Sequence, residues 1–253
     1  MQDATQGFDF DMVIVGASFA GAACAIAAAQ RGLRVCVLER KRDPGDKLRT
    51  TGIIVKEAAE RTLLHRLPAP ITRRIESVRL YAPSLKQVAL AAPGYYFLTT
   101  DTPAAMRWLA GHLREHGVDL RLDTSIETIT KLEGGYRLHT SAGEFSCESL
   151  VIATGGLSIP TLGATGFGYQ VAKQFGHTLL PTRAGLVPFT ITEPQLKALC
   201  TELSGTSVED CVVSCNGQSF KENILFTHRG LSGPAILQIS SLWQPGEAIS
   251  INL

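Results

Sequence analysis

The segment from Phe10 to Glu39 constrains the fold more than any other part of the chain. An apolar run, FDMVIV, leads through a glycine turn into the small-residue stretch SFAGAACAIAAAQRG, and a second apolar run, LRVCVLER, follows. Short apolar runs bounded by turn residues predict buried strands, and the alanine-rich stretch predicts a helix that ends at Gly32. The order strand, glycine turn, helix, strand predicts a Rossmann-like α/β unit that holds a dinucleotide.

The glycine turn and the end of the second strand supply the first candidate ligands. Gly16 and Gly21 would let the first N–H groups of the helix approach a pyrophosphate. Ser18 stands where G-x-G-x-x-G has its middle glycine, and its side chain is small enough to fit beside the phosphates. Glu39, 23 positions after Gly16, could accept hydrogen bonds from both ribose hydroxyls of an adenosine. Arg40 follows directly, either as an exposed charge or as a contact for the 2′-phosphate of NADP.

Composition narrows the class of protein. The 253 residues include 24 Lys and Arg against 23 Asp and Glu, scattered along the chain, so we expect no nucleic-acid partner. Six cysteines without a C-x-x-C pair predict reduced thiols in a cytoplasmic protein and no metal site. The apolar stretch from Met12 to Ala29 is divided by the glycine turn and preceded by aspartates. We therefore expect neither a targeting nor a transmembrane segment.

The middle of the chain changes pattern several times. A charged loop, RKRDPGDKLRTTG, precedes a predicted helix from Lys56 to about Leu67. Residues 71–100 form three strand-like pieces broken by prolines, and residues 102–117 predict a helix with Thr102 as its cap. Strands with a Gly134-Gly135 hairpin turn follow.

The last hundred residues predict one short helix and then strands. The glycine-rich stretch GATGFG starts the helix, and the chain from about Arg183 is strand-like. Within that part, Ser232-Gly233-Pro234 predicts a helix start, since proline is tolerated in a first turn.

The Gly16-to-Glu39 unit and the segment LVIATGG, residues 150–156, together resemble the two-part signature of the FAD-dependent oxidoreductase superfamily. The resemblance implies FAD as cofactor and hydride transfer through flavin N5. It also implies cofactor contacts at further positions. These are Lys47, Thr51 and Gly52 beside the flavin, Ile126 beside the adenine, and Thr154 and Gly155 in the turn next to the cofactor. For Ile126, an ordinary core role is an equal alternative.

Two parts of the chain resemble different branches of this superfamily, which gives the chain a mosaic appearance. Residues 10 to about 105 resemble flavoproteins of the geranylgeranyl-reductase and hydroxylase type, which suggest an unsaturated isoprenoid substrate. Residues from about 117 to 253 resemble the aminoacetone-oxidase-like NAD(P)/FAD-dependent family, which suggests a small amine-bearing compound. The resemblance leaves both substrates open and allows NAD(P)H as electron donor. The late glycine-rich segment that completes the flavin site in such proteins does not occur in this sequence.

The expected architecture is an α/β Rossmann-like FAD-binding fold with a β-rich substrate portion that is incomplete at its C-terminus. We assign residues 1–183 to the FAD-binding domain, with 71–100 as an inserted substrate sheet, and residues 184–253 to a partial substrate domain. The expected partner is a small-molecule substrate, and the oligomeric state is left open. An alternative is a non-catalytic or weakly active scaffold that binds FAD or another adenine nucleotide.

Three further patterns carry weaker functional hypotheses. Tyr169-x-x-x-Lys173, with Ser158 upstream, would suit an NADP-dependent reductase, although a tyrosine that packs a helix is the stronger expectation. The stretch from His112 to His116 spells H-x-x-E-H, for which we predict a polar helix face. His228 and Arg229 are weak catalytic candidates, with a structural loop as the alternative.

Overall fold

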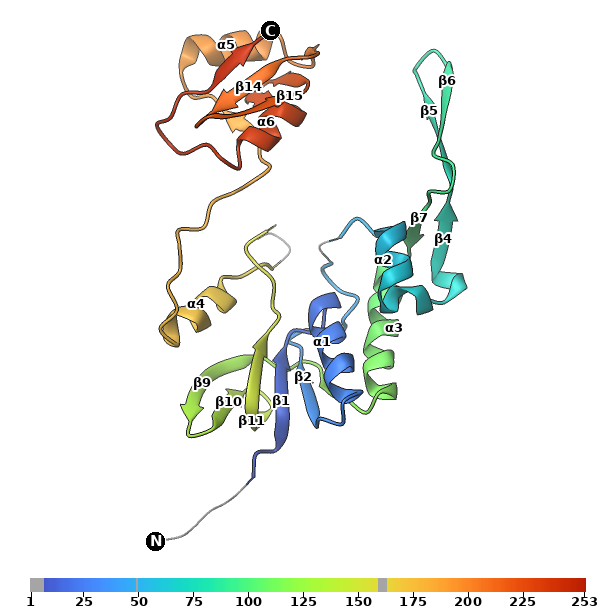
Figure 1. Ribbon diagram of the computed structural model, residues 1–253, viewed down its shortest axis with the longest axis vertical. Coiled ribbons are helices and arrows are strands. Elements are labelled where there is room, and N and C mark those ends of the chain that lie inside the picture. Colours follow the sequence, from blue (N-terminus) through green and yellow to red (C-terminus); the bar gives the residue numbers. More distant parts are fainter. Residues whose placement is uncertain (1–6, 49, 159–162) are drawn as a thin grey trace. The chain divides into compact units, whose positions relative to one another are not determined.

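The computed structural model describes residues 7–48, 50–158 and 163–253, and its chain divides into two compact units between Leu179 and Leu180 (Figure 1). Residues 159–162, which follow the LVIATGG segment, and residue 49 of the charged loop lie outside the described residues. The first unit is a mixed α/β, Rossmann-like fold. The second is built from short strands and two helices.

A six-stranded sheet forms the centre of the first unit. Its strands lie in the order β8 (Asp119–Arg121), β2 (Val35–Leu38), β1 (Phe10–Val15), β11 (Gly143–Ile152), β10 (Gly135–Thr140) and β9 (Ile126–Leu132). The first four are parallel, and β10 and β9 continue the sheet antiparallel. The hairpin turn between β9 and β10 contains Gly134 at φ +75°, as the glycine pair predicts.

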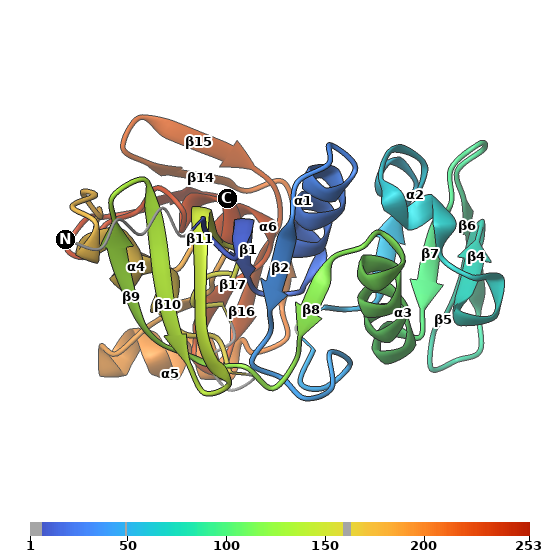
Figure 2. The same ribbon diagram turned by 90° about the horizontal axis from the view of Figure 1, so that it is seen from below.

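Helices cover both faces of this sheet, because successive strand residues point to opposite sides. Helices α1 (Phe19–Ala29) and α3 (Thr102–Glu115) pack on the face of Ile14, Val35 and Val37, whereas α4 (Phe167–Gln174) packs on the other face (Figure 2). The buried residues of α1 are small apart from Ile26, which allows a close approach to the sheet; they are Gly21, Ala22, Ala25, Ile26 and Ala28.

Two helix boundaries differ from the sequence expectation. Asp101, not Thr102, is the N-cap of α3: its Oδ1 accepts a hydrogen bond from the Ala104 amide at 3.1 Å. Helix α2 (Lys56–Arg61) ends well before Leu67, because Thr62 is extended. Two short 3₁₀ turns follow, η1 (Leu63–Arg66) and η2 (Ala69–Ile71).

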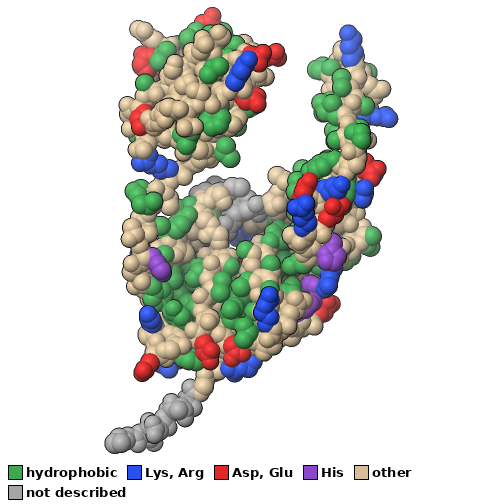
Figure 3. Space-filling view, in the orientation of Figure 1, with side chains coloured by type: hydrophobic (Ala, Val, Ile, Leu, Met, Phe, Trp, Pro, Cys, Tyr) green, Lys and Arg blue, Asp and Glu red, His purple; other side chains and the backbone are tan. Residues whose placement is uncertain are grey.

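The strand-like pieces within residues 71–100 form two small sheets. Strands β3 (Ile53–Val55), β7 (Phe97–Thr100) and β4 (Thr72–Ile75) make one, and β5 (Ser77–Tyr81) with β6 (Gln87–Ala91) makes a two-stranded ribbon. Every residue of the ribbon strands is exposed, and hydrophobic side chains gather along it in Figure 3.

The second unit has two sheets around one apolar core. One contains β12 (Phe189–Thr190), β17 (Gly230–Ser232), β16 (Ile224–Thr227) and β13 (Ser207–Val208), and the other contains β15 (Gln218–Lys221), β14 (Val212–Cys215) and β18 (Ser250–Asn252). Helix α6 (Pro234–Ile239) starts directly after Gly233, as predicted. Helix α5 (Pro194–Glu202) lies in a region that we expected to be strand-like.

All six cysteines are free thiols, and five of them are buried. In the described part of the chain, every helix is too short or too polar to span a lipid bilayer.

Candidate functional site

The turn after β1 leaves no room for side chains at its two glycines. Gly16 has φ +106°, and a Cβ there would lie 2.6 Å from the Ala153 carbonyl oxygen. A Cβ on Gly21 would lie 1.9 Å from the Gly16 carbonyl oxygen. Backbone hydrogen bonds hold the turn between the neighbouring strands, from Gly16 N to Leu38 O and from Ala153 N to Val15 O, both 2.8 Å. The start of α1 is therefore fixed at the carboxyl ends of three parallel strands.

A cavity of about 790 Å³ opens at these strand ends, which is where α/β sheets bind their ligands. Its volume lies within the range of cofactor sites. Its lining comes from the β1–α1 turn with the start of α1, the end of β2 with the loop that follows, Met106 of α3, residues 124–126, and residues within 153–158 and within 165–170. Its lining includes the predicted Gly16, Ser18, Glu39, Arg40, Lys47, Ile126, Thr154 and Gly155.

Two helix N-termini face this cavity. Ser18 is the N-cap of α1 and is extended, and its hydroxyl makes no capping hydrogen bond. Gly166 caps α4 without a side-chain hydrogen bond, and it lines the same cavity with Thr165 and Phe167. The first N–H groups of a helix have no intrahelical partners and carry partial positive charge, so both termini favour a bound anion. The sequence analysis noted the glycine-rich start of α4 without assigning it to the site.

Glu39 is half-buried at the rim of the cavity and is held by two backbone amides. Its Oε2 accepts from Ala17 N and its Oε1 from Lys41 N, each at 3.0 Å. A carboxylate oxygen has two acceptor positions, so both oxygens can still accept from ribose hydroxyls. The Glu39 carbonyl also accepts from Thr124 N at 2.9 Å. This contact brings Thr124 and Ser125, which sequence reasoning missed, into the lining.

The turn after β11 contains a buried polar atom without a partner. Thr154 Oγ1 is buried and makes no hydrogen bond in the described structure. Gly155, at φ +74°, would place a Cβ in open space. Buried hydroxyls are nearly always hydrogen-bonded, so the Thr154 hydroxyl is suited to a polar ligand in the cavity. The glycine turn after β1, the Glu39 carboxylate and this hydroxyl together fit FAD.

An ion pair fixes the loop that forms another wall. Arg107 on α3 contacts the Asp43 carboxylate at 2.6 Å, and this guanidinium lowers the pKa of Asp43 below its ordinary value. Asp43 Oδ1 also accepts from Gly45 N at 2.8 Å. The anchored loop carries Pro44 and Lys47 to the cavity, and Lys47 has φ +46°.

Three predicted cofactor residues, Gly21, Thr51 and Gly52, are not among the residues that line the cavity. Thr51 is exposed and does not line the cavity. Gly52 is buried against α3, where a Cβ would lie 2.6 Å from Thr102 Oγ1, so its packing explains the glycine. Arg40 lines the cavity, and its guanidinium donates to the Gly163 carbonyl.

Two of the weaker sequence patterns, Tyr169-x-x-x-Lys173 and His228-Arg229, have the following positions in the structure. The Tyr169 hydroxyl lies against Gly156, where a Cβ would be 3.0 Å away, and Lys173 is exposed one turn later. His228 and Arg229 lie in the exposed turn between β16 and β17 of the second unit. Their catalytic role stays a hypothesis.

The H-x-x-E-H stretch differs from the polar face that we expected, because His112 is only 7% exposed. Its Nδ1 lies 3.0 Å from Glu115 Oε2, and His116 Nδ1 contacts the His112 carbonyl at 2.9 Å. Among the residues that the structure describes, no three His, Cys, Asp or Glu side chains are grouped to hold a metal ion.

The fold and the cavity are those of a flavin-binding module, and the chain is similar to FAD-dependent oxidoreductases. A family model described as FAD dependent oxidoreductase matches residues 11–92. A second, described as HI0933-like protein barrel and H2TH domain, matches residues 183–253. FAD is accordingly the cofactor of this fold.

Relatives of known name align with most of this chain. It is 40% identical to the ribosomal RNA dihydrouridine synthase of Escherichia coli and 33% identical to that of Haemophilus influenzae, over 96% and 95% of this chain. It is 27% identical to the 3-dehydro-bile acid delta(4,6)-reductase of Clostridium scindens over 90% of this chain. The alignments span 64%, 63% and 59% of those relatives. Each of these relatives therefore aligns with both parts of the chain that resemble different branches, residues 10 to about 105 and about 117 to 253.

Proposed function

We propose that this chain is the FAD-binding part of a reductase that converts uridine to dihydrouridine in ribosomal RNA. One observation carries the proposal: the 40% identity with a ribosomal RNA dihydrouridine synthase extends over 96% of the chain, including every segment that lines the cofactor cavity. The chain covers 64% of that relative, so substrate groups supplied by the remainder lie outside this proposal.

The proposed reaction adds a hydride and a proton across the C5–C6 double bond of uracil, which is conjugated to a carbonyl group. Bound FAD, reduced by NAD(P)H, would supply the hydride. The name of the bile-acid relative describes reduction of double bonds in a 3-oxo compound. Conjugated C=C reduction is thus common to both names, which favours the unsaturated type of substrate over the amine.

The residues of this chain would bind and orient the cofactor. The amides at the start of α1 and the Ser18 hydroxyl would bind the pyrophosphate, and Glu39 would accept from the adenosine ribose. The Thr154 hydroxyl would donate to or accept from a polar group of FAD.

A ribosomal RNA substrate replaces our expectation that no nucleic acid takes part. The free thiols suit the cytoplasm, where such RNA occurs.

The test is a reduction assay with the FAD-loaded protein, NADPH and ribosomal RNA that lacks dihydrouridine. We expect mass spectrometry of the digested nucleosides to detect dihydrouridine, and we expect Glu39→Gln to lower the yield at limiting FAD. Glu127→Gln, an exposed substitution on β9, is the matched control.

Other outcomes would identify the alternatives. A colourless protein that binds adenine nucleotides would support the scaffold, and flavin reduction by an amine would support the oxidase. Reduction by NADPH without bound flavin, abolished by Tyr169→Phe, would support the Tyr169 and Lys173 hypothesis. A flavoprotein that NADPH reduces but that leaves uridine unchanged in ribosomal RNA would refute the proposal.

A further inference from the structure

Residues 53–100 of the first unit carry an excess of positive charge. They include seven Lys and Arg against three Glu, a formal charge of +4, whereas the formal charge of the whole chain is +1, so the remainder of the chain is slightly acidic. In the described structure none of these residues lines the cofactor cavity. The charge difference marks this segment as a candidate surface for an anionic partner.

Three basic side chains of this segment have no partner among the residues that the structure describes. Arg73 of β4, Arg79 of β5 and Lys86 directly before β6 are exposed, and none of the three takes part in an ion pair or a side-chain hydrogen bond there. Arg34 and Arg121, elsewhere in the unit, instead contact aspartates at 2.7 and 2.8 Å. The charges of the three unpaired side chains are therefore available to an external anion.

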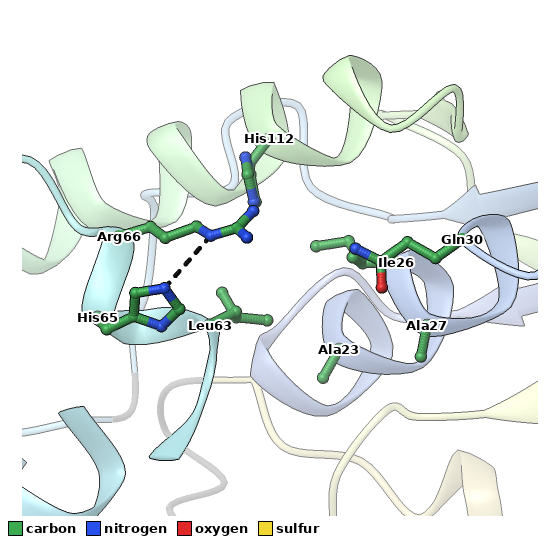
Figure 4. A pocket seen from close by; sticks show the side chains of 8 residues that line it. All are labelled: Ala23, Ile26, Ala27, Gln30, Leu63, His65, Arg66 and His112. Atoms are coloured by element: carbon green, nitrogen blue, oxygen red, sulfur yellow. Dashed lines mark hydrogen bonds between the residues drawn. The ribbon is translucent and has the colours of Figure 1, made fainter. Parts of the chain in front are cut away.

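Two other cations of the segment are held by the protein itself. Arg74 pairs with Glu76 at 2.7 Å. Arg66 extends toward His112 of α3, and its Nε contacts His65 Nε2 at 3.4 Å (Figure 4). The surface that is open to a partner therefore consists of the β5–β6 ribbon and of β4, which leads into it.

The ribbon has one polar and one apolar face, because successive strand residues point to opposite sides. On the polar face, Arg79 lies opposite Ala89, and Tyr81 lies opposite Gln87. The Cα atoms of Arg79 and Tyr81 are about 7 Å apart by strand geometry. Tyr81 is 60% exposed, so its ring is accessible to a partner. The side chains of the apolar face are those of Val78, Leu80, Val88 and Leu90.

We propose that the polar face of the ribbon holds a single-stranded segment of the RNA substrate, and this assignment rests on the proposed function. Arg73, Arg79 and Lys86 contact backbone phosphates, and Tyr81 stacks on an unpaired base. Phosphate contacts combined with stacking on aromatic rings are the usual means of binding a single strand. A single strand is required because the bases of a duplex are already stacked on one another.

Two other kinds of partner fit the ribbon less well. Both outer edges of the two-stranded sheet expose backbone groups without ladder partners, and the interior of a lipid bilayer cannot satisfy such groups. A second copy of the chain would bring together two segments that each carry a formal charge of +4. RNA supplies phosphates for the cations, and its 2′-hydroxyls can form hydrogen bonds with the free strand edges. Charge complementarity therefore favours RNA.

The experiment is a titration of labelled oligouridylate with the FAD-loaded protein, followed by fluorescence anisotropy at several salt concentrations. The double substitution Arg79→Gln/Lys86→Gln should raise the Kd by about tenfold or more. It should also lower the slope of log Kd against log salt by about 1.4, since each phosphate contact of a single strand contributes about 0.7. The control Arg114→Gln/Lys131→Gln removes one arginine and one lysine charge from exposed positions of α3 and β9, and should leave the Kd and the slope unchanged.

Tyr81 tests stacking separately from charge. Tyr81→Leu should raise the Kd for oligouridylate by about fivefold or more, whereas Tyr81→Phe keeps the ring and should bind like the parent protein. A duplex of oligouridylate with oligoadenylate should respond equally to the parent protein and to Tyr81→Leu, because its bases are not free to stack on the ring.

Equal oligouridylate affinities and salt slopes in the parent protein and in Arg79→Gln/Lys86→Gln would overturn the RNA surface. Binding of phosphatidylglycerol vesicles through these two cations, without binding of oligouridylate, would overturn it as well. If such a parent protein still forms dihydrouridine in the reduction assay, the proposed function stands without this surface. Binding of RNA that depends on the ribbon, in a protein that leaves uridine unchanged, would support the surface and refute the reductase.

Discussion

At the residue scale, one carboxylate connects three segments that are distant in sequence. Glu39 accepts from amides of the β1–α1 turn and of its own loop, and its carbonyl accepts from Thr124 N. The acidic residue at the end of β2 was predictable from its position after the glycine turn. The contribution of Thr124 and Ser125 to the cavity was not predictable. A tertiary backbone contact brings them there, and no local sequence pattern marks them.

We expect Glu39→Gln to weaken FAD binding by about tenfold, since an uncharged amide accepts more weakly from ribose hydroxyls and also presents donors to the Ala17 or Lys41 amide. Fluorescence titration of the apoprotein with FAD measures the change. Glu127→Gln on β9, which lies outside the cavity lining, should bind FAD like the parent protein. An unchanged Kd for Glu39→Gln would place the adenosine elsewhere.

Replacing Gly21 in α1 and Gly111 in α3 by alanine should change the stability of the protein in opposite directions. Gly21→Ala creates a Cβ 1.9 Å from the Gly16 carbonyl oxygen, so the turn must shift, at a cost of about 1–3 kcal/mol of unfolding free energy and with loss of FAD. Gly111→Ala meets no atom within 4 Å and should gain about 0.5–1 kcal/mol from helix propensity. Urea unfolding and flavin absorbance measure both effects. Equal stability in the two variants would contradict the close packing of α1.

At the element scale, helices with a strong sequence pattern were predictable, whereas α5 is marked mainly by its N-cap. α1, α3 and α6 were expected from alanine content, apolar spacing and a Gly-Pro start. α5 was missed, although Glu193 followed by Pro194 is a helix-start signal. Its N-cap carboxylate accepts from the Leu196 amide at 2.7 Å and the Gln195 amide at 3.1 Å. The neighbouring apolar and β-branched residues masked that signal in a strand-like region.

The cap makes the stability of α5 depend on pH. Hydrogen bonds from the Leu196 and Gln195 amides lower the pKa of Glu193 below its ordinary value of 4.5. Its stabilising contribution is therefore complete above about pH 4.5 and is lost as the pH falls through the lower, folded-state pKa. Glu193→Gln should lower the melting temperature of the second unit at pH 7, with a smaller difference at pH 3.5.

Glu202→Gln removes the same charge from the opposite end of α5 and is the matched control. A negative charge near a helix C-terminus is unfavourable, so this variant should be neutral or slightly more stable at pH 7. Destabilisation by both substitutions to the same extent would indicate a general charge effect and would remove the cap from the explanation.

At the scale of the whole molecule, the two units have separate apolar cores. One sheet with cores on both faces carries the cofactor cavity, and an independent cluster around Ile236 and Ile239 holds the second unit. The FAD-binding fold was predictable because each of the two parts of its signature is a continuous stretch of sequence. The pairings of the short strands in the second unit were not, since strands of two to four residues carry little pattern of their own.

This organisation predicts that FAD stabilises only the first unit. A ligand at 100 times its Kd adds about 2.7 kcal/mol to the unit that binds it, which for a unit of this size raises the melting temperature by roughly 5–10 °C. The two tryptophans report the units separately: Trp108 stacks on His112, and Trp243 donates to the Glu247 carbonyl at 2.7 Å. In Trp243→Phe, fluorescence melting should shift with FAD, whereas in Trp108→Phe it should not. A shift of equal size in both variants would mean that the units unfold as one, and FAD binding would then be coupled to the β-rich unit.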